Sequence, residues 1–201
     1  GRLNLEGVPT SGRVIREMIK DGKLSDWDDP RLTTLIALKR RGFTSEGIKN
    51  FLLRTGISKT DATVSWDILY AENRKVIDPI SNRYFAVLNP IKISIKNAPE
   101  IKEIEASLHP DFPERGKRKV FVDVRKIYVE KDDLEKFENK EIGLMNLFSV
   151  KLRKDAEFIS KDIKFEVQKI HWVSEPNIKV KIVMPNGEIK EALAEPEIKN
   201  V

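Results

Sequence analysis

The sequence predicts an α+β fold in which a small helical segment is followed by two antiparallel β-barrels. Before Pro79 the apolar residues recur three or four positions apart, as on one face of a helix. After Pro79 they alternate with polar residues, as along half-exposed strands. The chain has 201 residues, 40% of them hydrophobic, which is enough for one or two domains with a core. We therefore divide it into residues 1–13, a helical domain over 14–79 and the barrels over 80–201.

Three or four short helices joined by tight turns are expected in the first part. Each begins at a residue that can cap a helix N-terminus, and most end at glycine. The expected helices are residues 12–22; a second that opens with the Asp28-Asp29 cap and Pro30 and ends at Gly42; a third from Thr44 or Ser45 to Gly56; and a fourth opened by Ser58 and Asp61 and ending near Ile77.

Short strands at regular spacing are expected after Pro79, which is typical of barrels and sandwiches. The predicted strands cover residues 84–88, 91–95, 120–124, 127–129, 142–152, 163–173 and 178–184. Asn186-Gly187 predicts a type I′ hairpin after the last of them. Residues 97–116 form the one long connection, rich in proline and charge, and such loops are often functional.

Charge and cysteine content exclude several classes of function. The 37 Lys and Arg residues exceed the 32 Asp and Glu residues by five, which permits a nucleic-acid surface without requiring one. The chain has no cysteine, so disulfides, cysteine-based zinc sites and thiol catalysis are excluded. No apolar run approaches the roughly 20 residues that span a bilayer, so we expect a soluble, cytoplasmic protein without a membrane partner.

Motifs of self-sufficient enzymes are absent from the sequence. Neither a glycine-rich phosphate loop nor a G-x-S-x-G nucleophile motif occurs. His109 and His171 lie in different segments, so we expect a loop residue and a half-exposed strand residue rather than a metal site. Asp28-Asp29 and Asp132-Asp133 stand where helix caps are expected. The residues alone thus favour a binding module without a metal or cofactor of its own.

Six segments, in order, resemble the C-terminal part of class I glutamyl-tRNA synthetases of the archaeal and eukaryotic type and of their glutaminyl relatives. The order makes the resemblance specific, and it covers essentially the whole chain. The segments are residues 1–7; Trp27-Asp28-Asp29-Pro30-Arg31-Leu32 with residues 38–42; Glu72-Asn73-Arg74 with Asp78-Pro79 and residues 83–90; residues 109–118; Ile170-His171-Trp172-Val173; and Ala194-Glu195-Pro196.

The resemblance implies that the helical segment contacts the inner side of a tRNA and that two barrels read its anticodon. Residues 144–150 are similar to the glutamyl group, so the implied partner is tRNA(Glu), and tRNA(Gln) is an open alternative. A glutaminyl enzyme's anticodon portion is the first rival interpretation. A protein-interaction module that kept the barrels but lost tRNA binding is the second, and an unrelated all-β binding module is the third.

The family's catalytic nucleotide-binding domain, with its His-x-Gly-His motif, is expected before Gly1, in the same chain or as a separate one. The complete enzyme would use ATP and magnesium, whereas this chain alone is expected to be inactive. Residues 1–13 look like the remnant of the strand that leads into the family's signature loop, which here reads Thr10-Ser11-Gly12-Arg13. Gly12 stands in place of a lysine that contacts ATP phosphates, and Arg13 or Arg16 is the candidate substitute. The second barrel is expected to lack its closing strand.

The resemblance also suggests tRNA-binding residues, each with a structural alternative. Arg83 aligns with an arginine that contacts the middle anticodon base, and a surface ion pair is its alternative. Arg115, Lys117 and Arg118 crowd the proline-rich loop and are candidates for phosphate contact, or for a solvated turn. The remaining candidates are Lys140, which could meet the anticodon-loop backbone, and Lys39, Arg40 and Arg41, which could grip the tRNA or complement a helix C-terminus.

Overall fold

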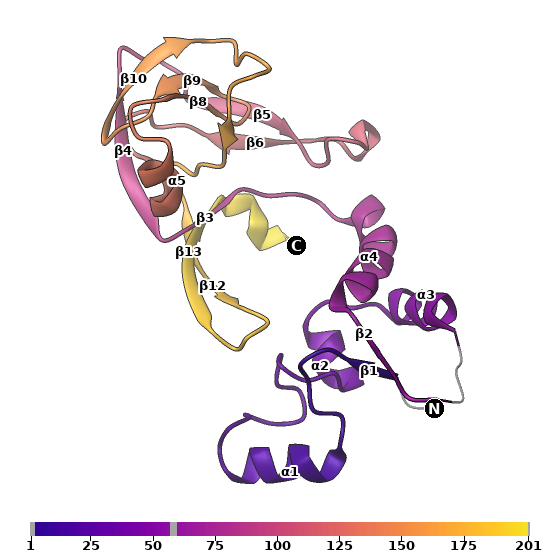
Figure 1. Ribbon diagram of the computed structural model, residues 1–201. Helices are drawn as coiled ribbons and strands as arrows, with labels where there is room; N and C mark the ends of the chain where they lie inside the picture. Colours follow the sequence, from indigo (N-terminus) through magenta and orange to yellow (C-terminus); the bar gives the residue numbers. More distant parts are fainter. Residues whose placement is uncertain (1–2, 57–59, 201) are drawn as a thin grey trace. The chain divides into compact units, whose positions relative to one another are not determined.

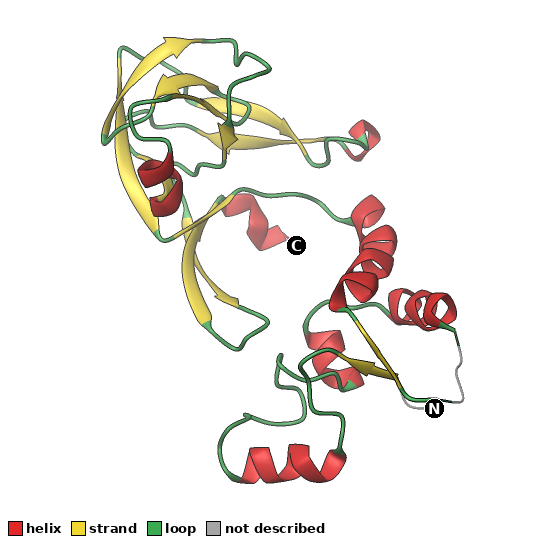
Figure 2. Cartoon of the chain, in the orientation of Figure 1, coloured by secondary structure: helices red, strands yellow, loops and turns green. Residues whose placement is uncertain are grey.

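A computed structural model describes residues 3–56 and 60–200 (Figure 1). The chain folds as two compact units. The helical unit comprises Gly1–Ser81 and Val183–Ile189, and the barrel unit comprises Asn82–Ile182 and Lys190–Val201. Helices make up most of the regular structure of the first unit, and strands make up most of the second (Figure 2).

The helical unit contains two short strands and four helices among its described residues. Its elements, in order, are β1 (Leu3–Leu5), α1 (Gly12–Lys20), α2 (Leu35–Arg40), α3 (Ser45–Thr55), β2 (Ala62–Val64), α4 (Trp66–Ile77) and the 3-10 turn η1 (Asp78–Ile80). The core buries Leu5, Leu38, Phe43, Phe51 and Leu69. β1 and β2 pair in parallel, with Leu3 opposite Ala62.

Helices α3 and α4 approach each other closely at a glycine. A Cβ atom added to Gly47 of α3 would lie 2.8 Å from the Cα atom of Asn73 of α4. The Asn73 amide oxygen accepts the backbone N–H of Thr44 at 2.8 Å, and its amide nitrogen donates to the Gly42 carbonyl at 3.1 Å. The absence of a side chain at Gly47 therefore lets Asn73 reach the start of α3.

The third predicted helix is confirmed at both ends. Thr44 is the N-cap of α3, and its hydroxyl accepts the Gly47 N–H at 2.9 Å. Gly56 ends the helix with φ = 75°, in the left-handed region that favours glycine. The first helix is also found, as α1, which buries Ile15.

The predicted starts of the second and fourth helices are wrong. Asp29 does not cap a helix, because α2 begins only at Leu35, where the Thr34 hydroxyl accepts the N–H of Ala37. Ser58 lies outside the described residues. The cap of α4 is Ser65, because Ala62–Val64 pairs with β1 and so cannot be helical.

The barrel unit is built mainly from strands. Its elements are β3 (Ala86–Leu88), β4 (Pro90–Lys96), β5 (Glu103–Ser107), η2 (Pro113–Arg115), β6 (Lys117–Phe121), β7 (Ile127–Glu130), α5 (Lys131–Lys136), β8 (Glu141–Leu144), β9 (Phe148–Lys151), β10 (Asp155–Ser160), β11 (Lys169–Ile170), β12 (Ile178–Val183), β13 (Ile189–Ala194) and η3 (Pro196–Asn200).

The largest sheet is a nearly closed barrel. Six strands follow the order β11-β8-β9-β10-β4-β7, and Figure 1 shows β4 running along one side of it. Tyr128 of β7 and Val173, which follows β11, exchange backbone hydrogen bonds of 2.7 and 3.0 Å, so the two edges of the sheet are bridged. Trp172 and Phe148 are fully buried in the core. The sheet is not purely antiparallel as predicted, because β4 pairs with β10 and β8 with β11 in parallel.

The remaining strands form two smaller sheets, of order β12-β13-β3 and β5-β6. The predicted second barrel is not confirmed, since in the described part of the chain its strands form only the three-stranded sheet. Strand β5 lies within residues 97–116, which were expected to be one connection.

Two predicted strands and one turn also differ from the structure. Residues 142–152 form a hairpin of β8 and β9, because Asn146 adopts φ = 61° and reverses the chain. Residues 163–173 contain only the short strand β11. The β12–β13 turn is not type I′, since Gly187 has a positive φ of 85° and Asn186 does not.

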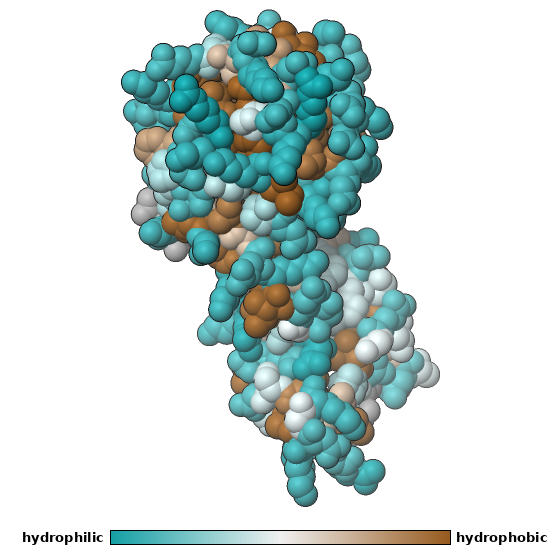
Figure 3. Space-filling model, turned by 90° about the vertical axis from the view of Figure 1, so that its left-hand side faces the viewer, coloured by the Kyte–Doolittle hydropathy of each residue, from teal (hydrophilic) through white to brown (hydrophobic). Residues whose placement is uncertain are grey.

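The surface is largely hydrophilic on the face shown in Figure 3, with hydrophobic residues in separate small groups. Within residues 3–56 and 60–200, no helix has the length and apolar character needed to cross a membrane.

Candidate functional site

One cavity of the barrel unit gathers polar and aromatic side chains from five separate segments. We call it the barrel cleft, and its volume is about 480 Å³. Its walls come from the segment before β3, the end of β5 with the loop after it, β6, the β8–β9 turn and the residue after β11. The lining residues are Arg83, Tyr84, Phe85, Ser107, Pro110, Arg118, Met145, Asn146 and His171.

The segment that carries Arg83 is fixed by its backbone. The Arg83 N–H donates to the Leu108 carbonyl at 2.7 Å. Two positions on, the Phe85 N–H donates to the carboxylate of Glu195, and the Glu195 N–H donates back to the Phe85 carbonyl at 3.1 Å. Phe85 itself is buried, with its ring centroid 6.0 Å from that of Trp172. Arg83 therefore stands on a rigid support, and its side chain is exposed at the cleft.

Arg118 lies at the base of the cleft and not on the surface. Its side chain is only 5% exposed and forms an ion pair of 2.8 Å with Glu195, which is 3% exposed. Its Nε also donates to Glu195, and its third nitrogen donates to the Ser107 carbonyl at 2.6 Å. Each nitrogen of the guanidinium thus has an acceptor inside the protein, and these contacts favour a positioning role over contact with a phosphate.

Asn146 and His171 belong to the cleft, and sequence reasoning did not select them as site residues. Asn146 is exposed at the β8–β9 turn, and the adjacent Met145 carbonyl accepts the indole N–H of Trp172 at 2.9 Å. The His171 ring meets Phe85 edge-on at 5.6 Å. The only sequence signal for Asn146 was an asparagine within an apolar stretch, a residue type that tolerates the left-handed conformation it adopts here.

Asp133, a carboxyl group on α5, has a pKa that is shifted mainly by its burial. Burial raises the pKa of Asp133, and the charge of His171 acts against that increase. The cleft therefore combines cationic groups, an amide and aromatic edges beside a partly buried carboxyl group.

The other predicted cations of the barrel unit do not line the cleft. Arg115 donates to the amide oxygen of Asn82 at 2.6 and 3.2 Å. Lys117 pairs with Glu105 at 2.9 Å on the exposed surface, and this ammonium holds the pKa of Glu105 below its ordinary value. Lys140 is exposed, with its ammonium 5.9 Å from the centroid of the Phe137 ring.

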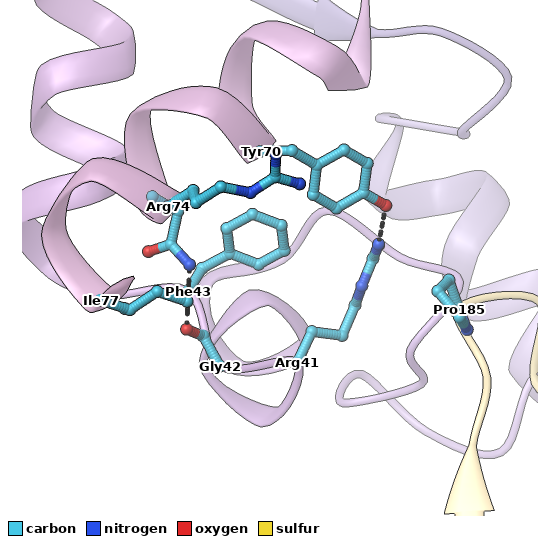
Figure 4. Close-up of a pocket in the computed structure, with 8 residues that line it drawn as sticks. Arg41, Gly42, Phe43, Tyr70, Arg74, Ile77 and Pro185 are labelled. Carbon is cyan, nitrogen blue, oxygen red and sulfur yellow. Dashed lines mark hydrogen bonds between the residues drawn. The ribbon is translucent and has the colours of Figure 1, made fainter. Parts of the chain in front are cut away.

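The helical unit has a cavity of its own, of about 340 Å³, at the C-terminal end of α2 (Figure 4). It is lined by Arg41, Gly42, Phe43, Tyr70, Asn73, Arg74, Ile77 and Pro185. Figure 4 shows Arg41 reaching to the Tyr70 hydroxyl, to which it donates a hydrogen bond. The guanidinium also lies 4.3 Å from the centroid of the Trp66 ring and donates to the Pro30 carbonyl at 3.3 Å. Arg41 is thus engaged within its own unit.

Arg40 and Lys39, which precede Arg41, differ in whether they form an ion pair within the chain. Arg40 pairs with Asp28 at 3.0 Å. Lys39 is exposed, lines a second cavity of about 650 Å³ beside Leu35, and has no ion-pair partner among the described residues. Of the three adjacent cations, Lys39 is therefore the most accessible to a ligand.

Residues 10–13, which were expected to form a degenerate signature loop, lie at the start of α1. Ser11 is the N-cap of that helix, although its hydroxyl makes no capping hydrogen bond, and Gly12 is exposed. Arg13 is exposed and lies 3.7 Å from Glu17 one turn along. Arg16 is also exposed.

Two family models match this chain in succession. Residues 1–79 match the model described as "tRNA synthetases class I (E and Q), catalytic domain". Residues 81–171, which hold the barrel cleft, match "tRNA synthetases class I (E and Q), anti-codon binding domain".

Curated relatives of the chain are glutamate–tRNA ligases of archaea. The chain is 40% identical to that of Pyrococcus horikoshii in an alignment of 213 positions that covers 99% of this chain and 37% of the relative. It is 44% identical to that of Pyrococcus furiosus over 94% of this chain and 34% of the relative. The ligase of Methanocaldococcus jannaschii is 40% identical over 100% of this chain and 37% of the relative. The chain thus spans little more than a third of the relatives' length.

Proposed function

Because the chain belongs to the class I tRNA synthetases of the glutamate and glutamine group, we propose that it is the tRNA-binding portion of a glutamyl-tRNA synthetase. Its partner is tRNA(Glu), recognised at the anticodon and along the inner side, in the cytoplasm. The supporting observation is the barrel cleft, which lies in the segment that matches the anticodon-binding domain.

The cleft has the chemistry needed to read an unpaired base. Bases of RNA loops are recognised when they are unstacked, stacked on aromatic or guanidinium planes, and hydrogen-bonded at their edges. Arg83 presents a planar fork of donors on a fixed backbone, and Asn146 offers both a donor and an acceptor. We assign Arg83 to the middle anticodon base and Asn146 to a neighbouring base edge.

Phosphate contacts supply the remaining affinity in this proposal. In the barrel unit the exposed Lys117 and Lys140, together with Arg115, approach the anticodon-loop backbone. In the helical unit Lys39, Arg40 and Arg41 face the inner side of the tRNA, with Lys39 the most accessible. Each such contact adds affinity that falls with salt, because the cation releases a counterion from the RNA.

The chain spans little more than a third of the length of the ligases that it matches, and we assign it tRNA binding and not the ligase reaction. We place that reaction in a catalytic domain, in the same chain or as a separate one, which uses ATP and magnesium. The role of the barrel cleft is to hold the anticodon so that the acceptor end of the tRNA is oriented for a reaction carried out elsewhere. We also assign the three-stranded sheet β12-β13-β3 to the second barrel of the family.

Binding of the chain to tRNA(Glu) at about 0.1 M salt tests the proposal, alongside the same tRNA with its middle anticodon base changed. We expect a preference for the native anticodon that Arg83→Ala removes. Arg125→Ala is the matched control, because it deletes one exposed arginine of the same unit that is not part of the cleft. Equal binding to both tRNAs would overturn the assignment of Arg83.

A parallel binding measurement with tRNA(Gln) distinguishes the glutamyl from the glutaminyl interpretation. The measurement is needed because the family model covers both groups. Preference for tRNA(Gln) would replace our proposal with the glutaminyl one. Absence of binding to any tRNA would favour a protein-interaction module.

A further inference from the structure

Phe165 is almost completely exposed. Its side chain lies in the segment between β10 and β11 and is 96% accessible, more than any other large hydrophobic residue in the described part of the chain. Single exposed hydrophobic residues are common on protein surfaces, so the meaning of this exposure depends on what surrounds Phe165.

The segment around Phe165 is held in place. The Gly143 N–H donates to the Gln168 carbonyl at 2.8 Å, and the Ser160 hydroxyl donates to the Asp162 carbonyl at 2.6 Å. Ile163 packs directly onto Gly143, where an added Cβ atom would lie 2.5 Å from its Cγ2 atom. Both ends of the segment are thus attached to β8 and β10, and a hydrogen bond of 3.3 Å from the Val167 N–H to the Lys164 carbonyl closes the turn that carries Phe165.

The segment packs on β8, and the residues that follow β8 line the barrel cleft. Gly143 and Met145 are two residues apart, and the Met145 N–H donates to the Ile170 carbonyl at 3.1 Å, so the pairing of β8 with β11 continues to Met145. Residues two apart along paired extended chain face the same side. Met145 lines the cleft, and Ile163 packs two residues before it, on Gly143.

The charges beside Phe165 suit an RNA. Lys161, Lys164 and Lys169 are exposed and have no ion-pair partner among the described residues, and the segment also carries the exposed Asp162 and Glu166. A protein-docking surface would require a contiguous apolar patch, but the residues on either side of Phe165 are charged. A single exposed ring among lysines is instead the combination that binds unpaired nucleotides.

We propose that Phe165 is a stacking platform for an unpaired base of the RNA that occupies the barrel cleft, with Lys161 and Lys164 contacting the adjacent phosphates. This inference rests on the proposed function, and extends the RNA contact of the barrel unit beyond the cleft. Stacking on a side chain depends on its aromatic face and not on base identity. Phe165 therefore adds affinity without anticodon preference.

Substitutions at Phe165 test this in tRNA(Glu) binding at fixed salt. Phe165→Ala and Phe165→Leu are expected to weaken binding about 10-fold, whereas Phe165→Trp retains it, because only tryptophan keeps an aromatic face. The fluorescence that the Phe165→Trp variant gains over the unmodified chain is expected to be quenched by tRNA. Phe121→Ala, which removes another exposed phenylalanine of the barrel unit, is the control and leaves affinity unchanged.

The measurements separate this inference from the proposed function. If the chain prefers the native anticodon and Phe165→Ala binds as tightly as the unmodified chain, the inference fails and the proposed function stands. Equal loss in the Phe165→Leu and Phe165→Trp variants would also overturn stacking. A Phe165→Ala variant with normal thermal unfolding excludes misfolding as the cause of any loss.

Discussion

The guanidinium of Arg118 and the carboxylate of Glu195 form a buried ion pair of 2.8 Å between residues that are 77 positions apart in the sequence. The same carboxylate accepts the N–H of Phe85. One contact therefore ties β6, the end of β13 and the segment that presents Arg83 to each other.

Substitution of either partner of this pair is expected to destabilise the barrel unit. Removing one member of a buried ion pair leaves the other charge without compensation, which costs about 3–5 kcal/mol. We expect Arg118→Met to lower the free energy of unfolding by about that amount. Adding Glu195→Gln to Arg118→Met is expected to cost less than Glu195→Gln costs alone. Urea unfolding of the four proteins measures this, and strictly additive losses would contradict the pairing.

Substitutions of Arg118 and Arg83 are expected to differ in their effect on the stability of the barrel unit. Arg83 is exposed, so Arg83→Ala is expected to leave the unfolding temperature unchanged while it removes anticodon preference. A fall in unfolding temperature for Arg83→Ala as large as for Arg118→Met would show that both residues are structural. Thermal unfolding by circular dichroism makes the comparison.

Lys39 and Arg41 are two positions apart but are expected to respond differently to truncation. Arg41→Ala removes a cation–π contact with Trp66 and a hydrogen bond to Tyr70, and is expected to cost about 1–2 kcal/mol of stability. Lys39→Ala is expected to leave stability unchanged and to weaken tRNA binding, with the salt slope reduced by about one. Salt titrations of both variants test this, and an unchanged slope for Lys39→Ala would remove it from the RNA contact.

Gly47→Ala is expected to destabilise the helical unit even though alanine favours helices. The added methyl group would lie 2.8 Å from the Asn73 Cα atom, so α3 and α4 must separate. Overpacking of this kind costs about 1–3 kcal/mol. Gly12→Ala is the control, since its Cβ would have an ordinary contact of 3.9 Å with Trp27. Equal stability of the two variants would rule out tight packing at Gly47.

Because of Asp29, the free energy of unfolding of the helical unit is expected to decrease as the pH falls. A hydrogen bond from the Arg31 side chain, and others from Ser25 and the Arg31 backbone, hold the pKa of Asp29 well below its ordinary value. A lowered folded-state pKa contributes stability that is fully present above the unfolded pKa of about 4 and is lost as the pH falls below it. We expect Asp29→Asn to cost about 2 kcal/mol at pH 7 and less at pH 3. Urea unfolding across this range measures the difference, and a constant gap would be inconsistent with the ion pair.

Local signals in the sequence predicted the elements whose cause is local. Thr44 and Gly56 define α3 through hydrogen bonding and backbone conformation within one helix, and both were correctly identified. Asp29 has the local pattern of a helix cap, yet its carboxylate binds Arg31 in a turn. Cap and turn use the same residue types, so composition at that position could not distinguish them.

The residues of the cleft were predictable only in part, because tertiary contacts determine which side chains line it. Arg83 is found at the cleft, whereas Arg118 differs from the surrounding cations only through Glu195, which is distant in sequence. Asn146 was hidden within an apolar stretch that resembles a single strand. The left-handed turn at that residue shortens both strands and exposes the amide.

The strand order of the barrel also determines when it can form during synthesis. β4 lies between β7 and β10, and Ser94 of β4 is paired with Asp155, 61 positions later. In a chain that leaves the ribosome N-terminus first, one edge of β4 therefore stays unpaired until β10 has been synthesised. The bridge between Tyr128 and Val173 forms later still, because Val173 follows β10 in the sequence. Helices α3 and α4, close neighbours along the chain, face no such delay. During this interval the backbone N–H and C=O groups along that edge of β4 lack their final partners, as those of an unpaired edge strand do.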